Sequence, residues 1–277
     1  MSAPDFGLII IGDEILHGQR QDCHFAYFKQ LLERRGLRLA WVQYLPDERE
    51  LLIHRLQRSF ADGGPVFVTG GIGSTPDDHT RQAAAAALAL PLVRHAEALS
   101  FIEERTLAMG ESLDSPGHAQ RAHMADFAEG AELVPNPFNR IAGFALREHY
   151  FLPGFPQMAH PMAAWVLDTH YAHCFHQTER REQAALIEGL PESAIAPLMD
   201  DIETRWPGIK TFSLPTVRHE APLQDPAHRR YRLEFGLKAE GAACDGFDAA
   251  WQYAYTRLSA LGASAITPLQ GYGRDTD

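Results

Sequence analysis

The fold is decided by the stretch Val66-Phe67-Val68-Thr69-Gly70-Gly71-Ile72-Gly73-Ser74-Thr75-Pro76-Asp77-Asp78-His79-Thr80. An apolar run typical of a β-strand ends in a glycine-rich turn, and we expect a helix that opens with two adjacent carboxylates to follow. Closely spaced glycines let backbone N–H groups face outward, and a helix N-terminus adds partial positive charge. The carboxylates are hard oxygen ligands of the kind that Mg²⁺ prefers. The stretch therefore predicts a site for a phosphorylated small molecule with a divalent metal.

The same residues also make a good helix start. Thr75 suits a cap, Pro76 suits the first helical position, and Asp77 and Asp78 suit the first turn. The run is not a P-loop, since no lysine follows the glycines, and it is not a dinucleotide fingerprint. On this stretch alone, a plain strand–turn–helix and a phosphate site both stay open.

Outward from this stretch, apolar strand patterns alternate with helical patterns along the first half of the chain. Strands are expected at residues 6–11, 37–45 and 66–68, with helices between them and at 81–90. This alternation predicts an α/β fold in which helices cover both faces of a parallel-rich sheet. Ligands of such sheets gather at the carboxyl ends of the strands. Acidic residues stand just after three of the predicted strands, namely Glu14, Asp47, Asp77 and Asp78.

Composition narrows the class of protein. The 277 residues favour two domains, and a formal charge of −11 argues against non-specific nucleic-acid binding. The three cysteines are scattered, so they predict neither a disulfide framework nor a zinc cluster. No segment is apolar over the length that a membrane span needs. We therefore expect a cytoplasmic protein without nucleic-acid or membrane partners.

The later part of the chain predicts a second, smaller domain. The polar run 177–183 reads as a linker, and a β-α-β-β-α order typical of a ferredoxin-like α+β sandwich follows it. The expected division is a first domain at 1–176, a second at 184–263 and a tail at 264–277. Within the tail, residues 271–277 are expected to be disordered.

Four segments together resemble one known family. They are Gly12-Asp13-Glu14-Ile15-Leu16, the run from Thr69 to Thr80, Ala131-Glu132-Leu133-Val134-Pro135-Asn136-Pro137 and Leu152-Pro153-Gly154-Phe155-Pro156. In this order they resemble the competence/damage-inducible protein A (CinA) family, whose N-terminal domain belongs to the molybdopterin-binding (MoCF) superfamily. The resemblance implies a three-layer MoCF-type domain followed by a small ferredoxin-like domain, a homodimer, and a metal-dependent nucleotide pyrophosphatase that acts on ADP-ribose-like compounds with Mg²⁺, Mn²⁺ or Co²⁺.

The resemblance also implies roles for individual residues. The phosphate or cofactor would lie on Gly70, Gly71, Gly73, Ser74, Thr75 and Asn136, and the metal on Asp47, Asp77 and Asp78. Asp78 and Glu14 are the candidate general bases. Simpler explanations stay open for three residues: Glu14 as an acid that stabilises the next helix start, Asp47 as an N-cap, and Asn136 as a turn residue that bonds its own backbone.

The chain departs from the family pattern at several positions. Asp22-Cys23-His24 stands where Asp-Thr-Asn is usual, and Asn139-Arg140-Ile141-Ala142-Gly143 stands where Gly-Thr-Ala-Pro-Gly is usual. The carboxylates and glycines are kept, so the departures bear on which substrate is used. Two other functions stay open: a molybdopterin-binding protein that places a pterin phosphate on the same loop, and a non-catalytic nucleotide-binding module.

Overall fold

A computed structural model describes residues 3–215 and 231–269 of this chain. The chain divides into two compact units, Met1–His176 and Gln177–Asp277. Each unit has its own sheet and its own hydrophobic core. Among the described residues, no helix is long and apolar enough to cross a membrane.

The first unit alternates strands and helices, as its sequence predicts. Its elements are β1 (Asp5–Ile11), α1 (Asp13–Leu16), α2 (His24–Glu33), β2 (Arg38–Leu45), α3 (Arg49–Asp62), β3 (Val66–Thr69), α4 (Thr80–Ala87), β4 (Leu92–Arg94), α5 (Ala96–Ala108), α6 (Pro116–Ala122), η1 (His123–Ala125), β5 (Asp126–Ala128), β6 (Glu132–Val134), β7 (Gly143–Leu146), β8 (His149–Leu152), α7 (Pro156–Val166), η2 (Leu167–Tyr171) and η3 (Ala172–Cys174).

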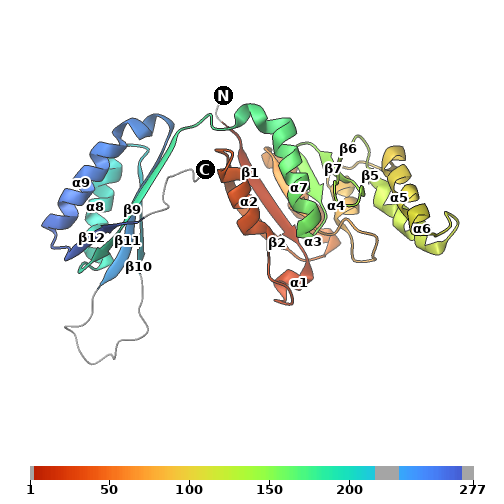
Figure 1. Cartoon of the computed structure of the whole chain (residues 1–277), viewed down its shortest axis with the longest axis horizontal. Helices are drawn as coiled ribbons and strands as arrows, with labels where there is room; N and C mark the ends of the chain where they lie inside the picture. The colour runs from red at the N-terminus through yellow and green to blue at the C-terminus, as the bar shows by residue number, and fades with distance from the viewer. Residues whose placement is uncertain (1–2, 216–230, 270–277) are drawn as a thin grey trace. The chain divides into compact units, whose positions relative to one another are not determined.

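These elements form three layers (Figure 1). The central sheet has six strands in the order β2-β1-β3-β8-β7-β6. The first four of these strands run parallel, and β7 and β6 are joined by antiparallel pairing. Helices α2 and α7 pack on one face of the sheet, and α3, α4 and α5 pack on the other. The predicted three-layer, parallel-rich MoCF-type fold is confirmed.

The parallel strands end at a common edge of this sheet. Ile11 of β1 is paired with Leu45 of β2, Ile10 with Thr69 of β3, and Thr69 with Leu152 of β8. The segments that follow these four strands therefore meet at one edge. In an open α/β sheet this is the edge where ligands bind.

The helix after the glycine turn begins next to the helical pattern predicted at 81–90 and not at the possible helix start Thr75–Asp78. Helix α4 begins at Thr80. The Asp78 carboxylate bonds back to Thr75, at 2.8 Å from its N and 2.5 Å from Oγ1, and this closes a separate turn. Thr80 then anchors the helix to the glycines, because its N–H donates to the Gly71 carbonyl at 3.0 Å.

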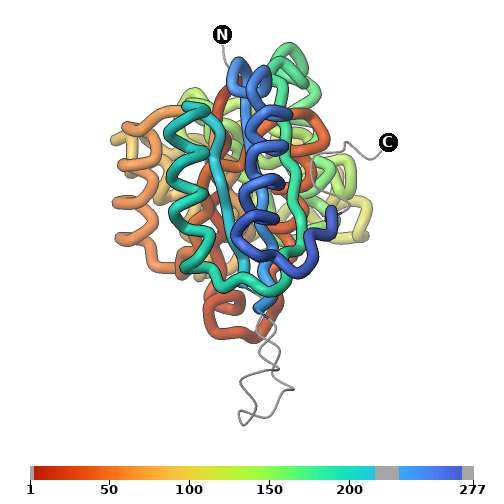
Figure 2. Tube along the Cα trace, turned by 90° about the vertical axis from the view of Figure 1, so that its left-hand side faces the viewer, coloured from red at the N-terminus to blue at the C-terminus, as the bar shows by residue number. Residues whose placement is uncertain are grey.

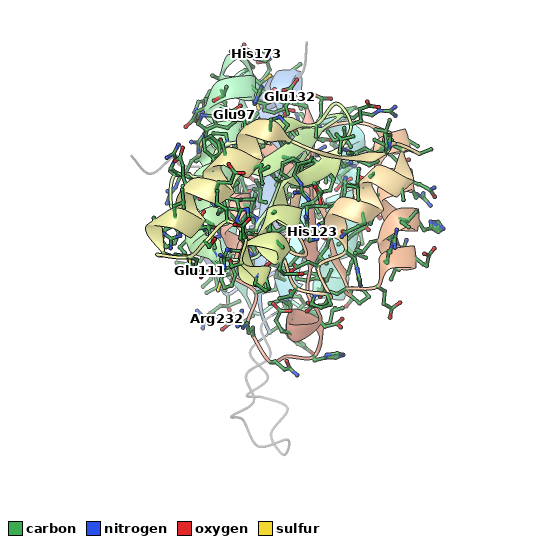
Figure 3. The ribbon with its side chains drawn as sticks, turned by 90° about the vertical axis from the view of Figure 1, so that its right-hand side faces the viewer. Glu97, Glu111, His123, Glu132, His173 and Arg232 are labelled. Carbon is green, nitrogen blue, oxygen red and sulfur yellow. The ribbon has the colours of Figure 1, made fainter. Side chains whose placement is uncertain are left out.

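A smaller part of the first unit carries α5 and α6 and a two-stranded sheet, β4 with β5. Figure 3 looks onto this side and labels Glu111 and His123, which lie before and after α6. Glu111 pairs with Arg121 at 2.5 Å, and His123 lies 2.9 Å from the Asp126 carboxylate. These contacts tie α6 to its surroundings, and Gln120 of the same helix donates a hydrogen bond to the Ser74 carbonyl of the glycine-rich turn.

The second unit is a ferredoxin-like sandwich, as predicted. Its elements are β9 (Arg180–Glu188), α8 (Glu192–Arg205), β10 (Lys210–Pro215), β11 (Arg232–Glu240), η5 (Gly241–Gly246), α9 (Phe247–Ala260) and β12 (Ala265–Pro268). The sheet is antiparallel with the order β10-β11-β9-β12, and α8 and α9 run side by side over it (Figure 2).

One boundary of the second unit is corrected by this sheet. The sequence predicts a tail at residues 264–277, and this is wrong for Ala265–Pro268, which form β12 and pair with β9. The alternating pattern of so short an edge strand is weak, and Ile266 alone packs against the core as a partly buried side chain. The predicted disordered segment 271–277 lies outside the described residues.

Candidate functional site

The glycine-rich turn starts in a gap that only glycine fits. Gly70 has a positive φ of 101°, and a Cβ there would lie 2.1 Å from the Ile11 carbonyl oxygen. Its N–H donates to the Leu152 carbonyl at 3.0 Å. The turn therefore passes between the ends of β1 and β8, and a larger residue would push it out of the sheet edge.

The next glycine meets the start of α4 and an acidic side chain. A Cβ on Gly71, whose φ is 66°, would lie 2.2 Å from Thr80 Oγ1 and 3.5 Å from Asp47 Oδ1. Thr80 is fully buried, and its hydroxyl donates to the Gly70 carbonyl at 3.0 Å. The Asp47 carboxylate thus lies against the glycine turn, as its place after β2 predicts.

The turn presents a row of free backbone donors. Within the described part of the chain, the N–H groups of residues 71–74 have no hydrogen-bond acceptor, whereas Thr75 N donates to Asp78. Successive unpaired N–H groups in a turn form a concave site that attracts anions. Gly71 and Gly73 belong to this row as predicted, and Ser74 is held through its carbonyl, which accepts a hydrogen bond from Gln120.

Arg81 of α4 donates a hydrogen bond to the turn, and the sequence did not single this residue out. Its side chain is 3% exposed, and Nη2 donates to the Gly73 carbonyl at 2.6 Å. The Arg81 Nε has no partner among the described residues, and burial lowers the pKa of the guanidinium although Asp78 and Asp126 face it. The one sequence signal for Arg81 is its position directly after Thr80, the last residue of the glycine-rich stretch.

Asp13 and Asp47 lie side by side next to the turn, and Glu14 and Asp77 are close enough to act on the charge of Asp47. Asp13 N donates to Asp47 Oδ2 at 3.0 Å, and Asp47 N donates to Asp13 Oδ1 at 3.4 Å. Burial first, and then the negative charges of Asp13, Glu14 and Asp77, raise the pKa of Asp47. Asp47 is not an N-cap, because α3 is preceded by Glu48 and no side chain caps it. We call Asp13, Glu14, Asp47 and Asp77 the acidic group.

Asp78 does not share this arrangement. Both of its hydrogen bonds go to Thr75, and a Cβ on Gly73 would lie 2.6 Å from Asp78 Oδ2. The carboxylate is therefore turned into its own loop. This geometry favours a role in shaping the turn over the predicted roles as metal ligand and general base.

Asn136 is also occupied within its own loop. The side chain is 4% exposed, and its Nδ2 donates to Asn139 Oδ1 at 2.8 Å and to the Ile141 carbonyl at 3.0 Å. Its Oδ1 accepts from Phe138 N at 3.0 Å. This is the turn role that stood as the alternative to ligand binding, and every polar atom of the Asn136 side chain is satisfied by it.

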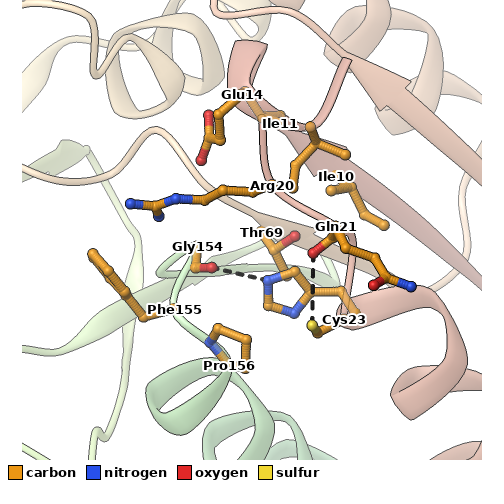
Figure 4. A pocket seen from close by; sticks show the side chains of 12 residues that line it. Ile10, Ile11, Glu14, Arg20, Gln21, Cys23, Thr69, Gly154, Phe155 and Pro156 are labelled. Atoms are coloured by element: carbon orange, nitrogen blue, oxygen red, sulfur yellow. Dashed lines mark hydrogen bonds between the residues drawn. The ribbon is translucent and has the colours of Figure 1, made fainter. Parts of the chain in front are cut away.

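A cavity of about 320 Å³ opens beside the sheet edge (Figure 4). Its apolar wall includes Ile10, Ile11, Ile15, Phe155 and Pro156, and Thr69 connects it to the first residue of the glycine turn. Glu14 and Arg20 line it as well. Figure 4 shows Arg20 extending across the cavity, with Glu14 to one side and Phe155 to the other.

His24, from the segment that departs from the family pattern, holds one wall of the cavity. It is 4% exposed, and its Nε2 lies 3.0 Å from the Gly154 carbonyl. Burial lowers the pKa of His24. The ring is therefore neutral near pH 7 and its hydrogen is on Nε2, because a carbonyl can only accept. His24 fixes the Pro153–Pro156 turn, and with it Phe155.

The donors of the acidic group suit a hard divalent cation. Among the described residues, no three acidic, histidine or cysteine side chains converge as a ready metal cage. Mg²⁺ is commonly held by one or two carboxylates together with substrate phosphates, and it keeps several waters. Asp47 and Asp77 beside the free N–H groups of the glycine turn fit that kind of shared site.

Comparison with known proteins agrees with this geometry. A family model described as a probable molybdopterin-binding domain matches residues 7–173. A CinA-like protein from Citrifermentans bemidjiense is 30% identical over 197 residues, which cover 70% of this chain and 46% of that protein. A CinA-like protein from Anaeromyxobacter dehalogenans is 27% identical over 278 residues, which cover 92% of this chain and 65% of that protein. The chain thus spans about half to two thirds of the length of these curated relatives.

A solved structure has the same fold. The crystal structure of a CinA protein from Thermoplasma acidophilum aligns with a TM-score of 0.52 at 21% identity, over 59% of this chain and 97% of that one. At this identity the likeness concerns the fold.

Proposed function

Because this chain belongs to the family of molybdopterin-binding (MoCF) domains and to its CinA-like members, we propose that its first unit binds a phosphorylated small molecule of nucleotide or pterin type and hydrolyses a pyrophosphate bond in it. ADP-ribose-like compounds are the proposed substrates. The observation that carries the proposal is the row of free N–H groups at residues 71–74 directly beside the acidic group.

The N–H groups of the turn and the neighbouring carboxylates have opposite effects on a bound phosphate unless a cation lies between them. Free N–H groups attract a phosphate, whereas Asp47, 3.5 Å from the Cβ position of Gly71, repels it. A divalent cation held by Asp47 and Asp77 would remove that repulsion. Such a cation also neutralises charge on phosphate oxygens and lowers the pKa of bound water. The neighbouring phosphate and acid sites therefore support a metal-dependent reaction of a phosphorylated substrate.

The chain's own groups account for the remaining steps. Water attacks one phosphorus, the bridging P–O bond breaks, and each product keeps one phosphate. Glu14 lines the cavity and lies over the end of β1, where a Cβ on Gly12 would be 2.8 Å from Glu14 Oε2. In this proposal Glu14 accepts the proton of the attacking water, a contribution of about 10²–10⁴-fold for a general base. The N–H groups of residues 71–74 would hold the non-bridging oxygens as charge develops.

A hydrolysis screen tests the proposal. Purified full-length protein is incubated with ADP-ribose, FAD, NAD and dinucleoside polyphosphates, each with Mg²⁺, Mn²⁺ or Co²⁺ or with EDTA. We expect AMP and ribose 5-phosphate from ADP-ribose in the presence of metal and none with EDTA. No hydrolysis of any pyrophosphate under these conditions would contradict the enzymatic proposal.

A second function is favoured by the position of Asp78. With that carboxylate turned into its loop, the turn can hold a phosphate without taking part in chemistry. The protein would then be a molybdopterin-binding protein or a nucleotide-binding module without turnover. A pterin recovered from the purified protein, with no phosphate release in the screen, would favour this alternative.

A further inference from the structure

The cavity beside the sheet edge has an apolar wall and, apart from it, the charged side chains of Glu14 and Arg20. Its apolar wall is built from isoleucines and from Phe155, and the ring of Phe155 is 49% exposed. An exposed aromatic ring beside apolar side chains favours a flat, apolar ligand group, because both ring faces lose contact with water when they stack. A sugar placed against the isoleucines would instead leave its hydroxyl groups without partners.

Arg20 brings a cation to the same cavity. It is the one lysine or arginine among the residues that line the cavity, and within the described residues its guanidinium forms no hydrogen bond or ion pair. The chain as a whole carries a charge of −11, and several other arginines of the first unit, among them Arg35, Arg94 and Arg121, are paired with carboxylates. An unpaired guanidinium that extends across a cavity is suited to an anionic ligand group, which it can bind through two hydrogen bonds.

The cavity and the glycine turn lie on opposite sides of the sheet edge. His24 of α2 and Pro156 of α7 line the cavity, whereas the turn leads into α4 and touches Asp47, which precedes α3. Glu14 is common to both, because it lines the cavity and acts on the charge of Asp47. A ligand that reaches from one side to the other would pass Glu14 at its middle.

We infer that this cavity is the binding site for one nucleotide half of the ligand, with a purine- or pterin-class ring packed on Phe155 and the attached phosphate bound by Arg20. The inference rests on the proposed function for the class of ligand. It adds that the phosphoanhydride is held from both ends, by Arg20 on the α2/α7 side and by the glycine turn on the α3/α4 side. The preferred ligand is then a two-part molecule, and Arg20 and Phe155 determine which half enters the cavity.

Calorimetric titration with AMP in EDTA tests the inference on the full-length protein. AMP carries the ring and one phosphate but no bond to cleave, so binding is measured apart from turnover. Loss of one charge-assisted contact or one stacked ring corresponds to about a tenfold weaker Kd. We therefore expect Arg20→Ala and Phe155→Ala each to weaken AMP binding about tenfold or more, and Arg20→Lys and Phe155→Trp to restore part of it.

Matched variants control for charge and for aromatic surface. Arg34 is exposed on the C-terminal side of α2 and Phe138 is 62% exposed, and neither lines the cavity. Arg34→Ala and Phe138→Ala should bind AMP as the wild type does. Adenosine should depend on Phe155 but not on Arg20, and ribose 5-phosphate on Arg20 but not on Phe155.

The outcomes separate this inference from the proposed function. If AMP binding depends on Arg20 and Phe155 but no pyrophosphate is hydrolysed, the nucleotide site stands and the enzymatic proposal fails. If ADP-ribose is hydrolysed with an unchanged KM in Arg20→Ala and Phe155→Ala, the enzymatic proposal stands and the nucleotide site in the cavity is contradicted. The inference is also overturned if the wild type binds no AMP, or if both alanine variants bind it with wild-type Kd.

Discussion

Asp13 and Asp47 are joined by two reciprocal hydrogen bonds at the edge of the first sheet. The backbone N–H of Asp13 donates to Asp47 Oδ2 at 3.0 Å, and the backbone N–H of Asp47 donates to Asp13 Oδ1 at 3.4 Å. Backbone donors thus fix two acids side by side, with Glu14 and Asp77 near enough to raise the pKa of Asp47 further. Carboxylates kept together in this way repel one another when no cation is present. The cluster is therefore expected to respond to divalent metal in ways that can be measured.

The first prediction concerns Asp47→Asn. The amide oxygen can still accept from the Asp13 N–H, but one negative charge is removed, so the fold should be kept while metal binding weakens. In EDTA we expect the Tm to stay equal or to rise slightly. Excess Mg²⁺ should raise the Tm of the wild type by mass action and that of the variant much less. Equal metal-induced shifts in the two proteins would show that Asp47 holds no metal.

The second prediction concerns Gly71→Ala. The substitution places a Cβ at a φ of 66° and 2.2 Å from Thr80 Oγ1. Gly130→Ala is the matched control, because its φ is 82° and nothing lies within 4 Å of its Cβ position. The control should lose about 1–2 kcal/mol, the usual cost of this backbone region. Gly71→Ala should lose clearly more in chemical denaturation and should bind nucleotide weakly, and equal losses would mean that the contact with Thr80 is unimportant.

The third prediction separates two roles of Asp78. If the carboxylate shapes the turn by accepting from Thr75, then Asp78→Asn keeps an acceptor and should retain most stability and turnover. Asp78→Ala should raise KM and cost about 1 kcal/mol of stability through the lost hydrogen bonds. Steady-state kinetics beside thermal unfolding make the comparison. A kcat that collapses in Asp78→Asn would restore the general-base role that the sequence predicts.

The fourth prediction concerns Arg81. Replacing Arg81 by an apolar residue of similar length leaves the Gly73 carbonyl without its donor at 2.6 Å. Arg81→Met should therefore lower the free energy of unfolding by about 1–3 kcal/mol, the usual cost of an unsatisfied buried polar group. We expect the Kd for inorganic phosphate or AMP to rise several-fold as the turn loosens. A variant that is destabilised but binds normally would mean that Arg81 serves the core alone.

The fifth prediction is a pH dependence of stability that arises at His149. Burial lowers the pKa of His149 to about 4, and its Nε2 lies 2.7 Å from Ser59 Oγ. In the unfolded chain its pKa is near 6.5. The stabilisation is therefore complete above pH 6.5, falls as the pH drops because only the unfolded state takes up the proton, and is lost by about pH 4.

His149→Gln should flatten this part of the pH profile by on the order of 3 kcal/mol between pH 6.5 and 4. His54→Gln is the control, since His54 is exposed on α3. Urea unfolding at several pH values measures the difference between each variant and the wild type. A profile of His149→Gln that runs parallel to the wild type would contradict the assignment.

Much of the fold could be predicted because its signals are local. Buried strands such as Val66–Thr69 are continuous apolar runs, and the glycines after them mark the one place where the chain must pass close to a neighbouring strand. The meeting of Asp47 with the glycine turn also followed, because parallel strands end at a common edge. What the sequence did not show depends on contacts between side chains. The Asp78 carboxylate accepts hydrogen bonds from Thr75, and Asn136 forms its hydrogen bonds within its own loop.

Other residues lay beyond sequence reasoning for a different reason. Arg20 and Phe155 stand far apart in the chain, and only the folding of the segments after β1 and β8 brings them to one cavity. Arg81 has no distinguishing feature in the sequence, and its role depends on the hydrogen bond to the Gly73 carbonyl that the folded turn makes possible. Long-range assembly of this kind is set by the whole core and not by any local motif.

The position of β12 has a consequence for how the protein is made. In the second sheet β9 comes first in the chain, yet one of its two neighbours, β12, is made last. During synthesis on the ribosome β9 must therefore wait with one side unpaired, while the first unit, whose strands all precede it, can already fold. An open strand side can pair with other nascent chains. Slow or interrupted translation before β12 should thus favour association between unfinished chains.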